Sequence, residues 1–474
     1  MNAPAAAGGG SMLRREWQLL RREGLAPWAL VALALLLLAA ALNGRALLGA
    51  HGATAAALQE ETESTLKALA DQAARGVPTA TSPGAVGYSV LAEPALLPRA
   101  PLGALAIGQG DLLPFHYAVT ARGPYTFLTR TEPDNSLRLA TGNFDAAFVI
   151  VWLLPLVVIA LSFGIVSAER ERGVLAIAVV SGTSAPRFVV GKLLARAALV
   201  VGALWVAIVA AALVAGVPVG RPEGALPLLA WLVVATLYAA FWFALALWVN
   251  AVPRSSDQNA SLLAGAWLVL VILAPALTNL AATTVFAAPS RVELTTELRE
   301  ATEAADREAA ADRDQYFFDH PEMQGGEMDR TAYFQSVART EASISKAMAP
   351  LLERFEVQAL RQQGLVEVLQ YLSPATLAWQ SLTALAGSDG ARHREFRAQA
   401  VAFQGGWSEF FASRLMRGAS LGPADYAALP RFRFAEPATA SVLARVALPL
   451  AVLALLVALL AWLALRRLRR LPVT

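Results

Sequence analysis

Histidine and carboxylate side chains are the residues of this sequence whose chemistry suits metal binding or proton transfer. The histidines show neither an H-x-x-x-H nor an H-E-x-x-H spacing and stand at His51, His116, His320 and His393. A carboxylate-rich patch could hold a cation, although a solvated helix end has the same composition. It consists of Asp312, Asp314, Asp319, His320 and Glu322. The sequence has no cysteine, which excludes thiol nucleophiles, thiolate metal sites and disulfides. We therefore expect no metal site.

Sequence signatures of nucleotide binding and nucleophilic catalysis are also absent. The stretch from Gly182 to Lys192 comes nearest to a phosphate-binding loop, but its spacing does not fit G-x-x-x-x-G-K-[ST] and Leu193 follows the lysine. No serine stands in a G-x-S-x-G motif. We therefore expect neither a catalytic site nor a cofactor on this chain. Any ATP-driven activity would need a partner subunit.

Residues 168–196 combine charged, apolar and turn-forming segments. Residues 169–172 are too charged to lie in lipid, residues 173–180 are apolar and expected to be helical, and residues 181–186 favour a turn. Such a stretch suits a surface on which a soluble motor acts, and equally an ordinary loop on a membrane. The candidate contact residues are Glu169, Arg170, Glu171, Arg172, Gly173, Arg187 and Lys192.

The composition indicates a membrane protein. Of the 474 residues, 56% are hydrophobic and 16% are charged, against about 25% charged in soluble domains. The net charge of +3 is nearly balanced, so we expect no nucleic-acid partner. Several stretches approach the roughly 20 apolar residues needed to span a bilayer. They are residues 25–42, 148–167, 193–214, 226–249, 262–282 and 446–465.

Basic residues near the span ends predict the orientation. The turn between spans three and four, on one side of the membrane, has only Arg221. The short flanks on the opposite side have Arg14, Arg15, Arg21, Arg22, Arg170, Arg172, Arg187, Lys192, Arg254, Arg466, Arg467, Arg469 and Arg470. By the positive-inside rule both termini are cytoplasmic, including the tail 466–474. Residues 1–24 would hold an interfacial helix with its apolar side at Leu13, Trp17 and Leu20. Pro155 and Pro275 are candidate helix kinks.

The predicted fold is an all-α polytopic membrane protein with six transmembrane helices and two extracytoplasmic segments. The first segment, residues 43–147, begins with a helical pattern and continues as a mixed region with short strands at 88–91 and 125–129. Residues 148–282 hold spans two to five and the cytoplasmic loop 168–192. The second segment, residues 283–445, reads as helices, with a kink or division at Pro350 and an aromatic-rich helix at 395–416.

Residues 169–196, ERERGVLAIAVVSGTSAPRFVVGKLLAR, resemble the coupling region of type-2 ABC exporter permeases. They depart from that pattern at Val174, Ala176 and Gly182-Thr183. Further stretches resemble a bacterial branch of these permeases that carries a large, functionally uncharacterised extracytoplasmic insertion. These are RREW at 14–17, ALNG at 41–44, AIGQGDLLP at 106–114, and residues 141–161, 241–277 and 371–396.

The resemblance implies a permease subunit in the bacterial inner membrane that moves an unknown substrate. Its partners would be cytoplasmic ABC ATPase subunits and a second permease copy or paralogue. Glu169 and Glu171 would then pair with basic residues of the ATPase. Two alternatives remain open. The chain could transmit ATPase-driven motion to a periplasmic partner without transport, or it could be a membrane sensor with no ATPase.

Overall fold

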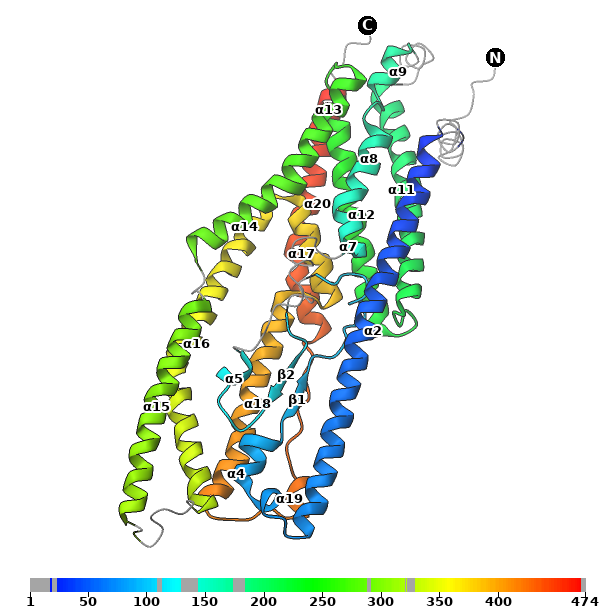
Figure 1. The fold of residues 1–474 in the computed structure, drawn as a ribbon. Helices are drawn as coiled ribbons and strands as arrows, with labels where there is room; N and C mark the ends of the chain where they lie inside the picture. Colours follow the sequence, from blue (N-terminus) through cyan, green and yellow to red (C-terminus); the bar gives the residue numbers. More distant parts are fainter. Residues whose placement is uncertain are drawn as a thin grey trace.

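Helices dominate the computed structural model, which is about 80% helical with almost no strand (Figure 1). It describes residues 24–108, 113–128, 144–173, 184–287, 291–319 and 329–469, together with Gln18 and Pro321. Six helical stretches among these residues are long and apolar enough to cross a membrane, which indicates a multi-pass membrane protein. They are Ala26–Ala74, Ala146–Glu171, Pro186–Ala215, Pro222–Asn250, Ser256–Val285 and Thr439–Leu468. Each overlaps a predicted span, and the first extends far beyond it.

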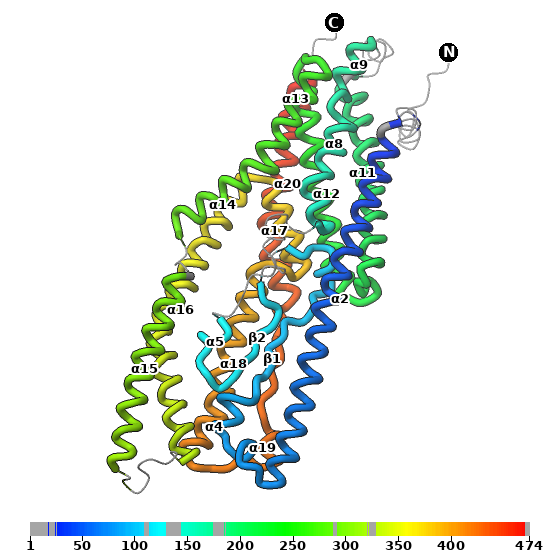
Figure 2. Tube along the Cα trace, viewed as in Figure 1, coloured from blue at the N-terminus to red at the C-terminus, as the bar shows by residue number. Residues whose placement is uncertain are grey.

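The first membrane helix is much longer than a bilayer requires. Helix α2 (Leu25–Ala74) runs for 50 residues, which is roughly 75 Å at 1.5 Å per residue, against a hydrocarbon core of about 30 Å. The predicted span 25–42 and the predicted helical pattern beyond it are therefore one continuous rod. Figure 2 shows this rod running along the whole length of the molecule.

The remaining spans form a bundle around α12 (Pro222–Asn250). The most apolar stretch of α12 is 72% buried, whereas that of the fifth span is 11% buried, so α12 is central and the fifth span is peripheral. Trp231, Tyr238 and Trp242 of α12 are fully buried. The other bundle helices are α7 (Ala146–Phe148), η2 (Val149–Leu153), α8 (Leu154–Ser162), α9 (Ser167–Glu171), α11 (Ala185–Ala215), α13 (Ser256–Trp267), η3 (Leu268–Leu273), α14 (Ala274–Val285) and α20 (Thr439–Leu468).

Both candidate kink prolines follow a change in helix type. The π-helical turns η2 and η3 end just before α8 and α14, and Pro155 and Pro275 are the second residues of those two helices. Proline cannot donate a backbone hydrogen bond, and a wider π turn accommodates it without ending the helix.

Helix α2 begins and α20 ends at the same end of the bundle, which we call the proximal end. The opposite end of the bundle is the distal end (Figure 1).

The chain outside the bundle forms a distal module with a two-stranded antiparallel sheet. Strand β1 (Glu93–Leu96) pairs with β2 (His116–Val119) in the register Glu93↔Val119 to Leu96↔His116. The predicted strands at 88–91 and 125–129 are wrong, because η1 (Val86–Val90) and α5 (Tyr125–Leu128) are helical. Prolines cause both errors, since Pro83 and Pro124 start helical turns just upstream. Two further short helices are α3 (Pro78–Thr81) and α4 (Pro83–Ala85).

A helical hairpin forms the outer arm of the distal module. Helix α15 (Arg291–Asp319) packs antiparallel on α16 (Arg330–Leu369) around Ala305, Ile344 and Met348. Helix α16 continues through Pro350, so the predicted division at this proline is not observed. The predicted aromatic helix is confirmed as α18 (Gly390–Met416), whose Phe396, Trp407 and Phe411 pack with residues of the sheet.

One short helix of the second long segment returns into the bundle. The turn η5 (Gln370–Leu372) leads from α16 into α17 (Pro374–Ala386), whose apolar residues belong to the bundle core. Ser373 Oγ donates to the carbonyl oxygen of Leu270, which lies midway along the fifth span. Residues 370–386 are therefore the tip and second arm of a re-entrant helical hairpin. This insertion was not predicted from the sequence.

Candidate functional site

The proximal end of the bundle holds the charged residues singled out in the sequence. Lys192 of α11 forms an ion pair with Glu169 of α9, and the two side chains are only 6% and 13% exposed. Glu169 was expected to meet a partner protein, but here it has a buried partner within the chain. A charge buried in this way is costly without its counter-ion. The pair therefore fixes α9 against the start of the third span.

Glu171 also has a partner within the chain. Its carboxylate accepts hydrogen bonds from the backbone N–H of Ser256 at 2.9 Å and from Ser256 Oγ at 3.1 Å. Ser256 is the first residue of α13, and a carboxylate at a helix N-terminus satisfies free N–H groups and complements the helix dipole. Ser167 Oγ lies 2.9 Å from Ser256 Oγ. The α9 segment thus caps the fifth span.

Further bonds tie the connection between spans two and three to the connection between spans four and five. Arg170 Nη2 donates to the carbonyl oxygen of Arg254 at 2.7 Å. Asn250, at the end of α12, accepts from the backbone N–H of Val166 at 3.4 Å and donates to the carbonyl oxygen of Ser162 at 3.2 Å. Asn259 of α13 donates to Asn250 Oδ1 at 3.2 Å. We call these contacts and the pair Glu169–Lys192 the proximal cluster.

The other predicted contact residues face outward or lie outside the described residues. Arg172 and Arg187 are exposed and have no hydrogen-bond or ion-pair partner among the described residues. Gly173 ends α9 with a φ of 72°, a left-handed conformation that favours glycine. Residues 174–183 of the predicted coupling loop lie outside the described residues, as do Leu13, Trp17 and Leu20 of the predicted interfacial helix. His320 and Glu322 of the carboxylate-rich patch lie outside them too.

A cavity of about 890 Å³ opens in the distal module. Stretches distant in sequence line it, namely residues 47–63 of α2, residues 93–107 and 113–115 around the sheet, the junction at 387–393 and residues 426–434. Residues 426–434 begin in α19 (Pro423–Ala427) and continue without regular structure. His51 of α2 stacks on Phe115 with ring centroids 4.4 Å apart. We call this cavity of about 890 Å³ the distal cavity.

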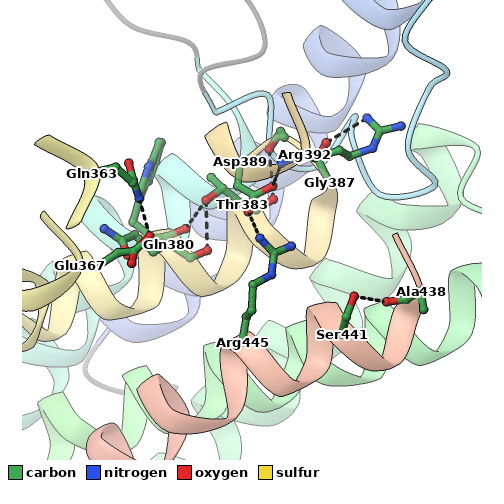
Figure 3. A network of polar contacts seen from close by, with 12 residues as sticks. Gln363, Glu367, Gln380, Thr383, Gly387, Asp389, Arg392, Ala438, Ser441 and Arg445 are labelled. Carbon is green, nitrogen blue, oxygen red and sulfur yellow. Dashed lines mark hydrogen bonds and ion pairs between the residues drawn. The ribbon is translucent and has the colours of Figure 1, made fainter. Parts of the chain in front are cut away.

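Arg392 organises one wall of the distal cavity. Its Nε donates to Glu436 Oε2 at 2.9 Å, and its two terminal nitrogens donate to the carbonyl oxygens of Gly387 and Pro98 at 3.1 and 2.8 Å. Asp389 caps α18 and accepts from Arg445 Nη1 at 3.2 Å (Figure 3). This wall joins α17, α18 and the start of α20. Apart from Pro98, which belongs to the predicted segment 43–147, its residues lie in the predicted segment 283–445, but local spacing gives no sign that they meet.

Burial shifts the protonation of two groups on this wall. Burial raises the pKa of the Asp389 carboxyl, although Arg445 beside it acts in the opposite direction. Burial, and after it the positive charges of Arg397 and Arg392, lowers the pKa of His393 to about 4. His393 is therefore neutral at pH 7.

Comparison with known proteins identifies part of the distal module. A family model described as a domain of unknown function, DUF3526, matches residues 291–435. No curated protein matches the chain. The matched region runs from the start of α15 to just beyond the last lining residue of the distal cavity, and it includes the re-entrant helix α17. The description of this family names no activity.

Proposed function

We propose that this chain is the membrane-spanning permease subunit of a bacterial ATP-driven transporter of the type-2 ABC class. The proximal end would face the cytoplasm, where separate ATPase subunits would act on the connection between spans two and three. The observation that supports this best is the proximal cluster, which bonds that connection to three different spans. The resemblance of residues 169–196 to permease coupling regions points the same way.

The proximal cluster is suited to transmit force. Movement of α9 would pull α11 through Lys192 and α13 through Ser256, while Asn250 holds α12 to the same segment. Breaking a buried ion pair costs about 3–5 kcal/mol, whereas coupling energies between sites are typically about 1–3 kcal/mol. The ion pair between Glu169 and Lys192 would therefore stay intact while free energy of that size passes between the ATPase and the spans.

The surface for the ATPase then differs in detail from the sequence-based expectation. Glu169 and Glu171 serve as internal anchors, so the contacts to the ATPase would come from Arg172, Arg187 and the segment between them. Acidic groups on the ATPase would complement these two cations. The permease would pair with a second copy or a paralogue, and its substrate is not specified by these contacts.

A co-purification experiment tests the proposal. The tagged full-length chain is solubilised in detergent, captured, and assayed for ATPase activity and for co-eluting subunits by mass spectrometry. We expect an ABC ATPase to elute with the wild type and with the control Arg75→Glu, and to be lost from Arg172→Glu/Arg187→Glu. Arg75 is an exposed arginine of the distal module, so the control makes the same charge change elsewhere. An unchanged ATPase yield with the double variant would refute the assigned surface.

One observation favours a second candidate, transmission of motion to a periplasmic partner without transport. Helix α2 is continuous from the proximal end to the far tip of the distal module, so movement in the bundle would reach that tip. A periplasmic protein that co-elutes with the ATPase, and leaves when the distal module is altered, would support this alternative. A wild-type chain that elutes with no ATPase would refute both candidates and leave the sensor hypothesis.

A further inference from the structure

We propose that the distal cavity binds an amphipathic anion, a phosphate or carboxylate head carried on a hydrocarbon chain. The inference concerns binding to the distal module, so it stands or falls separately from ATPase coupling. Three features of the cavity support it: guanidinium groups that have no partner among the described residues, a close approach of one of them to α2, and apolar walls that begin where the bundle ends.

Cations in excess of their partners line the distal cavity. Arg392 is paired with Glu436, and Arg431 Nε lies 3.2 Å from Glu93 Oε1. Arg99 and Arg433 line the same cavity and have no hydrogen-bond or ion-pair partner among the described residues. Guanidinium groups without a carboxylate partner suit the planar, two-point recognition of a phosphate or carboxylate.

The acidic residues of the cavity do not neutralise these two arginines. Glu93 is engaged by Arg431 and by the backbone N–H of Phe432, and Asp389 is engaged by Arg445. Glu63 lies eleven residues beyond Gly52 on α2, which is roughly 16 Å along the helix. A negatively charged ligand near Gly52 would therefore meet the guanidinium groups rather than free carboxylates.

Arg99 lies directly against the backbone of α2. A Cβ atom added at Gly52 would come within 1.5 Å of Arg99 Nη2, so a side chain at position 52 would displace the guanidinium. Glycine at this position therefore permits the exposed Arg99, which lines the cavity, to lie against α2. This geometry also provides a substitution that fills the site without removing a charge.

The apolar part of the cavity begins at the edge of the bundle. Arg45 Nη1 donates to the carbonyl oxygen of Val214, next to the end of α11, and this bond marks where the spans end. Leu47 and Leu48, two and three residues further along α2, line the cavity, and Gly52 follows about 10 Å beyond Arg45. A ligand chain would lie toward the membrane and its head against Arg99. A volume of about 890 Å³ lies within the usual range of about 300–1,000 Å³ for small-molecule sites.

Binding of three probes to the purified full-length chain tests the proposal. The probes are oleoyl lysophosphatidic acid, monoolein with the same chain and no charge, and glycerol 3-phosphate with the charge and no chain. Binding is measured in a neutral detergent by native mass spectrometry. The test variants are Arg99→Gln/Arg433→Gln and the filling variant Gly52→Leu. The matched control is Arg75→Gln/Arg361→Gln, which removes two exposed arginines that do not line the cavity.

We expect the wild type and the control to bind lysophosphatidic acid alike and both test variants to bind it roughly tenfold more weakly or worse. The other two probes should bind the wild type much more weakly. Undiminished binding to a folded Arg99→Gln/Arg433→Gln variant would overturn the proposal. If monoolein binds the wild type as tightly as lysophosphatidic acid does, the arginines do not contribute to binding. If glycerol 3-phosphate binds as tightly as lysophosphatidic acid does, the site recognises free phosphate. Either result also overturns the proposal. Melting curves establish folding, and the double glutamine variant decides the outcome if Gly52→Leu does not fold.

Discussion

The indole Nε1 of Trp231 donates a hydrogen bond of 2.9 Å to the carbonyl oxygen of Leu382, and both residues are fully buried. Trp231 belongs to the central span α12 and Leu382 to the re-entrant helix α17. Together with the bond from Ser373 to Leu270, this contact holds the hairpin at two points. At the tip of this hairpin the polar residues Gln370 and Ser373 are buried by protein, whereas the apolar side chain of Leu372 is 65% exposed.

Replacing Trp231 should therefore loosen the hairpin. Trp231→Phe removes the indole donor and some core volume, so we expect a loss of about 1–3 kcal/mol in stability. Thermal melting in detergent measures it. The control Trp28→Phe changes an indole that is 74% exposed and should shift stability by no more than about 0.5 kcal/mol. Equal melting temperatures for the two variants would contradict the anchoring role of Trp231.

The pair Glu169–Lys192 should behave as a unit. Lys192→Met leaves the Glu169 carboxylate buried without its cation, and we expect it to cost about 3–5 kcal/mol. The double variant Glu169→Gln/Lys192→Met removes both charges and should recover most of that loss. A double-mutant cycle on melting in detergent measures the coupling. Effects of Glu169→Gln and Lys192→Met that simply add would show that the two side chains act independently.

The spans could be predicted from the sequence because a bilayer imposes a minimum length on an apolar run. Helix α17 escaped prediction for the same reason. Its 13 residues, PATLAWQSLTALA, are too few to cross, and a short apolar helix in an external domain has the same pattern. Its place in the bundle depends on α12 and η3, whose contacts are not visible in local spacing.

The sequence allowed the residues of the candidate site to be chosen by their type, but it did not show which residues they contact. Charges at the ends of spans are visible in the sequence, so Glu169, Glu171 and Lys192 could be selected. Their pairings could not, since Glu171 binds a serine 85 residues away and Glu169 binds a lysine 23 residues away. The distal cavity was not anticipated at all, because its lining comes from stretches between positions 47 and 434.

The proposed orientation can be tested by cysteine labelling, because the chain has no cysteine of its own. Single cysteines are placed at the exposed positions Arg75, Arg172, Arg187 and Arg361. With the proximal end cytoplasmic, a membrane-impermeant maleimide should label positions 75 and 361 in intact spheroplasts. Positions 172 and 187 should be labelled after permeabilisation alone. The reverse pattern would place the distal module in the cytoplasm and refute the proposed topology.

Stability should depend on pH through His393. Its pKa is lowered from 6.5 to about 4 in the folded chain, by burial first and then by Arg397, Arg392 and Arg394. Protonation therefore favours the unfolded chain, so the contribution of neutral His393 is complete above pH 6.5 and is lost as the pH falls toward 4. The full difference is at most about 3 kcal/mol.

The variant His393→Gln isolates this contribution, because it stays neutral at every pH. Its melting temperature should fall less than that of the wild type between pH 7 and pH 4.5. The comparison between the two proteins is needed because Asp389 and Glu93, whose pKa values burial raises, titrate in the opposite sense and affect both proteins alike. Parallel pH profiles would show that His393 is not the group responsible.

The outer arm of the distal module is docked by a buried carboxylate. Glu341 of α16 accepts a hydrogen bond of 2.5 Å from the Tyr125 hydroxyl, and Arg122 Nη1 lies 3.3 Å from its other oxygen. Burial, followed by the hydrogen bond to Glu341, raises the pKa of Tyr125, so the phenol remains a donor at neutral pH. The Arg122 side chain is 43% exposed and therefore contributes less than the tyrosine.

Substitutions at this contact should release the arm in a definite order. Tyr125→Phe removes a bond to a charged group and should cost about 1.5–3 kcal/mol, whereas Arg122→Ala should cost less than about 1 kcal/mol. The expected readout is faster amide hydrogen exchange in α15 and α16 with a smaller change in α18, because α18 packs on the sheet as well as on α16. Tyr333→Phe, at an exposed position of α16, serves as the control. Exchange in α16 that is equally slow in Tyr125→Phe and the control would mean that apolar contacts around Met348, not the carboxylate, hold the arm.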